Sequence, residues 1–518
     1  MSMRVRAGVL AVAAVLVAGP VAGCDSAPDD HGGAARPSAA PLPPTGQAAS
    51  LPAAFTAQRP EWRACEAPEG EEAPGEQWRC ASVEVPLDYE RPSAGDPVAI
   101  ALIRKEARDR DRRIGSLLFN FGGPGASGVG MLPSFADQYH DLNSRYDLVG
   151  FDPRGVARSS GVVCRDDEDQ AAAEARIDLT PDTDAETAAF LRDGAEFGRG
   201  CATRAGKLIA HVTTANAARD MDVVRHVLGD RKLNYFGISY GTQLGGTYAH
   251  LFPENVGRTV LDAVTDPTAD AIGHARNQTT GFQRALNNYF ESTGEGAEAG
   301  TARVARLLRR LDREPLPAGG GRELTQSLAV TGIVYPLYGQ SMWPRLTDAL
   351  EEAENGRGDG LLRLADLYNN RDERGHYGTE QHAQRAISCA DSNQRPTAAQ
   401  AKALLPEFRR MSPVFGEFLA WDTAGWCARW PVKGEAATSE ASAPGAGPVL
   451  VVGTTGDPAT PYEGARRMAD ELGAGVGVLI TNKGEGHGAY GTSSCVTRTV
   501  DDYLLKGEVP ADGTTCAR

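Results

Sequence analysis

The chain has 518 residues and a formal net charge of −15 at pH 7, with 68 acidic against 53 basic side chains. An acidic protein of this kind has no electrostatic case for binding nucleic acid, so that class of partner is excluded. The length is sufficient for a large hydrophobic core together with an inserted domain.

The N-terminus carries the features of an export signal, which we place at residues 1–23. Arg4 and Arg6 precede a short apolar run at 9–17, and small residues lead up to Cys24. The run is too short to span a bilayer stably. The Val-Ala-Gly-Cys that ends at Cys24 resembles a bacterial lipobox, although an ordinary signal cut nearby is the alternative. We therefore predict an exported lipoprotein, anchored to the cell membrane through Cys24 or released to the medium.

A flexible tether is predicted at 24–57, because this stretch is rich in Ala, Pro, Ser, Gly and Asp. If Cys24 carries lipid, eight cysteines remain, and an even number in an exported chain suggests up to four disulfides. The absence of C-x-x-C and H-E-x-x-H from the sequence predicts no metal site, and we expect no cofactor. The simplest pairing joins cysteines that are neighbours in the sequence, among several possible connectivities: 65–80, 164–201, 389–427 and 495–516.

Short apolar strands alternate with helical patterns over 58–267, the first part of the predicted core. Such alternation favours an α/β fold, with a mostly parallel sheet covered by helices on both faces. The expected strands are 81–85, 98–103, 116–121, 146–151, 233–236 and 259–263, and the expected helices are 214–228 and 240–250.

A candidate nucleophile lies between the strand 233–236 and the helix that follows it. Gly237-Ile-Ser-Tyr-Gly241 is a G-x-S-x-G match, and strand, tight turn and helix are the context of a nucleophile elbow. The turn needs small residues two before and two after the serine, which Gly237 and Gly241 provide. The alternative is an ordinary loop rich in Gly and Ser. We predict Ser239 as the nucleophile.

The pattern changes to mainly helical over 268–447, which predicts an inserted cap domain. After an Ala/Ser/Gly/Pro-rich linker the core resumes at 448–518. Strands are expected at 448–453 and 477–481, and a final helix at 495–505.

A serine nucleophile needs a base and an acid that orients the base, and in this fold they follow the serine as acid, then histidine. His487 is the one histidine beyond the predicted cap, in a glycine-rich loop after the last strand. Asp457 follows the strand 448–453 and is our predicted acid; Asp266, one strand earlier, is the rival.

The developing oxyanion needs fixed backbone donors. One predicted donor is the amide of Tyr240, directly after the nucleophile. The other belongs to the turn after the strand 116–121, and Gly123 is the first choice because a missing side chain lets the backbone approach a substrate.

Five motifs together, in this order, resemble the α/β-hydrolase peptidases, and most of all the secreted tripeptidyl aminopeptidases of actinomycetes, relatives of proline iminopeptidase. The resemblance covers roughly residues 60 to 518. The motifs are Gly122-Gly-Pro-Gly125, Asp152-Pro-Arg-Gly155, Gly237-Ile-Ser-Tyr-Gly241, Gly456-Asp-Pro-Ala-Thr460 and Gly486-His487.

The resemblance implies a cap domain and removal of short peptides, tripeptides in particular, from free N-termini. It also implies the roles of Ser239 as nucleophile, Asp457 as acid and His487 as base. The proline iminopeptidase branch often has His before Gly-Gly-Pro-Gly, where this chain has Phe121.

An exopeptidase must also hold a substrate ammonium, for which Asp391 in the predicted cap is a candidate. Two other functions remain open from the residues alone. One is an esterase or lipase with the same triad, because fold does not decide substrate. The other is a catalytically inactive lipoprotein that binds envelope material.

Overall fold

The computed structural model describes residues 45–67 and 73–517. The predicted signal 1–23, the lipidation site Cys24 and most of the predicted tether lie outside the described residues. No helix in the described part of the chain is long and apolar enough to cross a bilayer.

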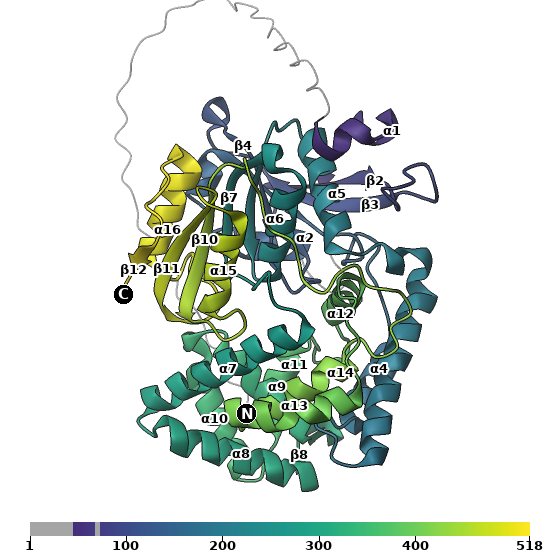
Figure 1. Cartoon of the computed structure of the whole chain (residues 1–518), viewed down its shortest axis with the longest axis vertical. Coiled ribbons are helices and arrows are strands. Elements are labelled where there is room, and N and C mark those ends of the chain that lie inside the picture. The colour runs from purple at the N-terminus through teal and green to yellow at the C-terminus, as the bar shows by residue number, and fades with distance from the viewer. Residues whose placement is uncertain (1–44, 68–72, 518) are drawn as a thin grey trace, which may run out of the picture. The chain divides into compact units, whose positions relative to one another are not determined.

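A ten-stranded sheet runs through the described part of the chain, in the order β1-β2-β3-β5-β4-β6-β7-β10-β11-β12 (Figure 1). The first three pairings are antiparallel, and every pairing from β5 to β12 is parallel. This confirms the predicted α/β-hydrolase class. The strands are β1 (Arg63–Ala64), β2 (Trp78–Val85), β3 (Val98–Lys105), β4 (Gly115–Asn120), β5 (Tyr146–Phe151), β6 (Leu233–Ile238), β7 (Val256–Asp262), β10 (Val449–Gly456), β11 (Gly477–Glu485) and β12 (Thr514–Cys516).

Helices cover both faces of the sheet, which is why β4 and β5 are buried along their whole length. One face packs against α5 (Thr214–Val227), α6 (Tyr240–Leu251) and α15 (Tyr462–Leu472). The other packs against α2 (Gly128–Ser134) and α16 (Ser494–Asp501).

Helices also fill the chain between β7 and β10. All of them except α12, whose buried apolar side chains pack with the core of the sheet, share a hydrophobic core of their own with the short hairpin β8 (Leu316–Pro317) and β9 (Glu323–Leu324). Figure 1 shows them gathered beyond one end of the sheet. They are α7 (Ala271–Thr293), α8 (Ala297–Arg313), α9 (Gln326–Leu337), α10 (Trp343–Glu354), α11 (Asp359–Tyr368), α12 (Glu380–Asp391), α13 (Ala398–Met411) and α14 (Gly416–Gly425).

Two helices that the sequence patterns did not indicate lie within the predicted first part of the core, α3 (Asp167–Arg176) and α4 (Asp184–Ala205). The side chain of Phe190 on α4 packs against Trp421 of α14, with ring centroids 6.1 Å apart. Thus α4 packs against the helices between β7 and β10, which we call the helical layer, although it precedes the nucleophile in the sequence.

The last residues of the predicted tether are part of the folded body. From residue 45 the chain packs along α5, where Ala48 is fully buried and the amide of Gln47 donates to Asp222 at 2.8 Å. The composition that indicates a flexible stalk does not reveal these contacts, because they are made by backbone groups and small side chains.

Four disulfides are present in the described part of the chain: 65–80, 164–201, 389–427 and 495–516. The sequential pairing is therefore confirmed. Each bridge closes a loop of modest length and restricts the unfolded chain.

Candidate active site

The turn between β6 and α6 holds Ser239 in a strained conformation, with φ 58° and ψ −125°. Such angles are unfavourable for a residue with a side chain, and they occur where the surrounding structure enforces them. A Cβ added to Gly237 would lie 2.4 Å from the backbone of the helix, and one on Gly241 would lie 2.6 Å from the backbone of β4. Both glycines are therefore sterically required, as expected for a nucleophile elbow.

His487 and Asp457 come together at the carboxyl ends of β11 and β10. Nδ1–H of His487 donates to the two carboxylate oxygens of Asp457, at 2.9 and 3.0 Å. The Asp457 side chain is fully buried, and it also accepts from the amides of Ala459 and Thr460 and from the Thr460 hydroxyl. With Nδ1 occupied in this way, Nε2 is the nitrogen of His487 that can accept a proton.

Asp266, the rival acid, has other partners. Its carboxylate pairs with Arg467 and accepts from Asn277 and Thr268. Among the described residues, the acid that contacts His487 is Asp457 alone.

No hydrogen bond joins the Ser239 hydroxyl to another described group, and catalytic contacts of this kind are often long in the absence of substrate.

A residue of the helical layer, Tyr338, also contacts His487, and nothing in the sequence indicated this. The carbonyl of Tyr338 accepts the backbone N–H of His487 at 2.9 Å, and the two rings meet edge to face at 5.2 Å. The helices between β7 and β10 thus touch the candidate base directly.

The surroundings of His487 influence its pKa in opposite directions. Burial disfavours the imidazolium, but the charge and hydrogen bond of Asp457, together with the charge of Asp262, outweigh burial and raise the pKa above the usual 6.5. The cation that forms during proton transfer is therefore stabilised.

We expect the acid limb of kcat/KM to have its midpoint above pH 6.5, because the base must be neutral to accept a proton. Activity should be full at pH values above the raised pKa of His487 and should fall as pH decreases through it. Hydrolysis of a small chromogenic ester over pH 4.5–9 measures this limb without a titrating substrate amine. A midpoint well below 6.5 would contradict the assignment of His487.

The turn after β4 lies directly against the nucleophile. The amide of Gly122 donates to Asn120 Oδ1 at 3.0 Å, so the amide of Gly123 is the next one that this turn can offer to a substrate. The amide of Tyr240 is at the first position of α6, where it has no partner within the helix. Gly123, Ser239 and Tyr240 line the same cavity.

Gly122→Ala should lower kcat by about 100-fold, the cost of misplacing reacting groups by about 1 Å. Gly122 has φ +94°, and an added Cβ would lie 2.7 Å from the Ile238 carbonyl and 2.8 Å from Cβ of Ser239. Gly229→Ala is the matched control, because Gly229 also has positive φ, +79°, but an added Cβ meets nothing within 4 Å. Equal kcat values for the two variants, measured on one ester, would show that the clash does not reach the nucleophile.

The candidate active site opens into a cavity of about 750 Å³ beneath the helices. Two of its carboxylates are of interest, and burial raises the pKa of both: that of Asp391 to about 7, opposed by bonds from Thr214, and that of Asp422 to about 6, opposed by the charge of Arg385. Sequence reasoning named Asp391 and missed Asp422, which lies on α14 without a distinguishing motif.

Asp391 ends α12 and accepts twice from Thr214, at 2.7 Å from the amide and 2.6 Å from the hydroxyl. The hydroxyls of Thr214 and Tyr240 are in turn 2.6 Å apart. Asp391 therefore links the helical layer to the residue that follows the candidate nucleophile. A carboxylate has further lone pairs, so these bonds are compatible with a substrate contact.

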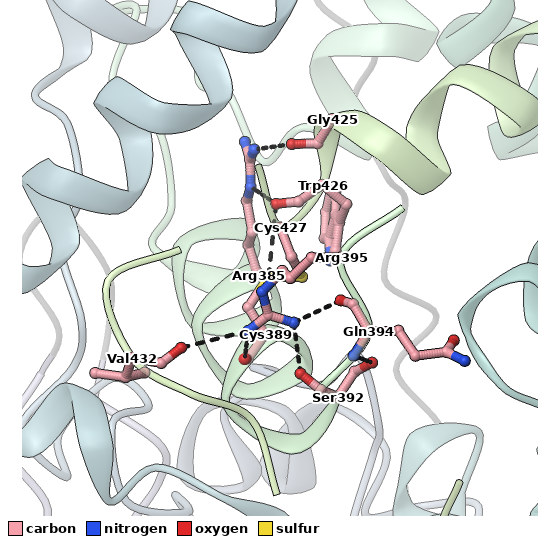
Figure 2. Close-up of a disulfide and its surroundings, with 9 residues drawn as sticks. All are labelled: Arg385, Cys389, Ser392, Gln394, Arg395, Gly425, Trp426, Cys427 and Val432. Carbon is pink, nitrogen blue, oxygen red and sulfur yellow. Dashed lines mark hydrogen bonds between the residues drawn. A yellow bond between two sulfur atoms is a disulfide. The ribbon is translucent and has the colours of Figure 1, made fainter. Parts of the chain in front are cut away.

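A disulfide supports the wall of the cavity near Asp391. Cys389 on α12 is bonded to Cys427, which follows α14 (Figure 2). One turn earlier on α12, the guanidinium of Arg385 donates to the carbonyl of Trp426 and, at 2.7 Å, to that of Gly425 (Figure 2). The covalent bond and the two hydrogen bonds join α12 to the end of α14.

Comparison with known proteins gives relatives along most of the chain. The family described as TAP-like protein matches residues 412–516. Serine protease Hip1 of Mycobacterium tuberculosis is 37% identical over 84% of this chain and 87% of its own. Carboxylesterase B of the same organism is 35% identical over 92% and 93%. Tripeptidyl aminopeptidase of Streptomyces coelicolor is 32% identical over 85% and 83%. The chain therefore belongs to the TAP-like family of α/β-hydrolase serine peptidases.

Proposed function

We propose that the protein is an exported serine exopeptidase that removes short peptides, tripeptides in particular, from free N-termini. The observation that carries the proposal is the hydrogen-bonded pair of His487 and Asp457 at the carboxyl end of the sheet. Ser239 is held in a strained turn at the same end of the sheet, and it lines a cavity. A relative with the name tripeptidyl aminopeptidase supports the finer specificity.

In the proposed reaction Ser239 Oγ attacks the peptide carbonyl while Nε2 of His487 takes its proton. The amides of Tyr240 and Gly123 stabilise the oxyanion. The imidazolium then protonates the leaving amine, and an acyl-enzyme forms on Ser239. Water then attacks the acyl-enzyme with His487 again as base, and Ser239 leaves with the proton that His487 returns. Asp457 holds the orientation of the ring throughout and, when the ring is neutral, keeps its proton on Nδ1.

An exopeptidase must recognise the substrate ammonium, and the cavity offers acidic groups for this. Asp391 and Asp422 line it, on α12 and α14. We propose Asp391 as the ammonium partner, since it is connected through Thr214 to Tyr240 beside the nucleophile. On this side the cavity is bounded by α12 and the end of α14, which the disulfide joins, and this wall limits the number of residues between the free N-terminus and the cleaved bond.

Asp391→Asn should raise KM for a tripeptide chromogenic substrate with a free N-terminus by about 10-fold or more, the value of a hydrogen bond to a charged group. Because the pKa of Asp391 is raised to about 7, KM of the wild type should also fall as pH rises through that value and the carboxylate ionises. The same substrate with a blocked N-terminus should be cleaved poorly by both proteins.

Thr214→Val is the matched control for Asp391→Asn. It removes the hydroxyl bonds that join Thr214 to Asp391 and Tyr240 but leaves the carboxylate charge in place. A rise in KM that is equal in the two variants would assign Asp391 a purely structural role. Equal cleavage of free and blocked substrates by the wild type would contradict the aminopeptidase proposal itself.

An esterase is the second candidate function, and one comparison favours it: the relative named carboxylesterase B matches 92% of the chain. The same triad would serve both reactions. The ratio of kcat/KM for a tripeptide anilide and for an acyl ester of similar size decides between them. A ratio far in favour of the ester, with no dependence on a free amine, would support the esterase.

We propose export and lipid anchoring at Cys24 on the signal-like sequence of residues 1–23. The four disulfides among the described residues support an oxidising compartment. In a detergent phase-separation assay, the wild type should enter the detergent phase and Cys24→Ser the aqueous phase. Identical partitioning of the two would contradict lipidation.

A further inference from the structure

Asp262 is a buried carboxylate that the proposed reaction does not use. It is the last residue of β7, the strand between β6, which leads into Ser239, and β10, which leads into Asp457. Its exposed fraction is 2%. Burying a carboxylate is costly unless hydrogen bonds compensate, so its partners need to be identified.

Two segments of the candidate site bond to Asp262, one through its backbone and one through its side chain. The backbone carbonyl accepts the N–H of Ser239 at 3.0 Å. The carboxylate accepts the N–H of Ala489 at 2.9 and 3.1 Å and that of Tyr490 at 2.8 Å. These two amides follow His487 by two and three residues, in the loop 486–491 that carries the base, which we call the base loop. Asp262 therefore bonds both to this loop and to the turn at Ser239, the nucleophile turn.

The base loop has little conformational preference of its own. Gly486, Gly488 and Gly491 all have positive φ, and glycine is the residue with the most backbone freedom. Beyond His487, the two amide bonds to Asp262 are the polar contacts nearest to the base along the chain. Further on, the carbonyl of Tyr490 accepts from Gln138 Nε2 at 2.8 Å and the amide of Gly491 donates to Thr497 at 2.9 Å. Aromatic packing of Tyr490 on Tyr139, with centroids 5.5 Å apart, holds the next part of the loop.

The position of Nε2 depends on this backbone path. The bond from Nδ1 to Asp457 sets one direction of the imidazole ring, and the backbone of residues 487–490 sets where the ring lies relative to the serine. A loop released from Asp262 could keep the bond to Asp457 while Nε2 moves away from Ser239. Proton transfer is sensitive to displacements of this size.

We propose that Asp262 is a positioning residue that keeps His487 in place relative to Ser239 by holding the Ala489 and Tyr490 amides beside the nucleophile turn. This inference rests on the proposed triad. It assigns Asp262 no contact with substrate, so its loss should affect turnover and not binding.

Two substitutions of Asp262 test the inference in a graded way. Asp262→Ala removes both acceptor oxygens and should lower kcat on a small ester by about 100-fold with KM unchanged, as for a displacement of about 1 Å. Asp262→Asn keeps one oxygen, which can still accept from both amides, and should lower kcat only by about fivefold, the value of about one hydrogen bond. The rate of labelling by a fluorophosphonate should fall in parallel in both variants.

Asp230→Ala is the matched control. Asp230 also has a carboxylate that accepts a backbone amide, that of Ser116 at 3.2 Å, and its side chain is only 10% exposed, but it lies just before β6, at the amino end of the strand that leads to Ser239. Its loss should lower the melting temperature and leave kcat near the wild-type value. A fall in kcat for Asp262→Ala no greater than for Asp230→Ala, or a loss confined to KM, would overturn the inference.

The outcome can be separated from failure of the triad assignment. Labelling that persists in Ser239→Ala would refute the triad whatever the Asp262 variants do. Labelling that requires Ser239 but proceeds at the normal rate in Asp262→Ala would refute only the positioning role. If Asp262→Ala does not fold, Asp262→Asn decides: unchanged kcat overturns the inference, and a fall in kcat at constant KM supports it.

Discussion

Replacement of Ser239 by alanine is expected to reduce kcat by about four to six orders of magnitude, the loss seen when a serine nucleophile is removed from a triad. The physical reason is that no other group can form the acyl-enzyme. The substitution removes one hydroxyl from a residue held in place by its backbone, so the turn keeps its shape. Active-site titration and steady-state hydrolysis of one ester measure the effect.

The folded state should be unaffected by Ser239→Ala. The backbone bonds of residue 239, to Asp262 and from Thr242, do not involve the side-chain oxygen. Circular dichroism and the melting temperature therefore serve as controls, and covalent labelling by a fluorophosphonate should disappear. Activity retained within about 100-fold would assign the nucleophile to another residue, since the oxyanion donors alone supply only a small part of the rate.

Asp457→Asn should reduce kcat by about 10⁴-fold with little change in KM. The carboxylate accepts from Nδ1 of His487, and an amide in its place can present NH₂ to the ring and favour the wrong tautomer. The imidazolium would also lose the charge that raises its pKa, so proton transfer to His487 becomes less favourable.

Asp266→Asn is the control for Asp457→Asn and also tests the rival assignment of the acid. Asp266 bonds to Arg467 and Asn277, so its replacement should lower stability and leave kcat nearly unchanged. Steady-state kinetics of both variants on the same ester give the comparison. If Asp266→Asn lost more turnover than Asp457→Asn, the order of acid and base proposed for this site would be wrong.

Features that depend on neighbouring residues could be predicted from the sequence. The elbow at Ser239 is a local strand, turn and helix whose glycines are required by contacts within a few residues and with β4. The expected strands and the helices α5 and α6 lie where the spacing of apolar residues predicts them, and the disulfides join cysteines that are close in the sequence. Order along the chain also indicated Asp457 and His487, because the architecture places acid and base after the serine.

Only the tertiary structure decided which distant groups meet. The helix α4 has an apolar face, but no pattern in the chain states that this face packs against α14. Asp391 has Thr214 as its partner, Tyr338 contacts His487, and Asp262 bonds to the base loop, across separations of more than a hundred residues. A sequence determines local conformation through short-range sterics and periodic burial, whereas the partner of a buried polar group is set by how whole elements pack, and that becomes visible only in three dimensions.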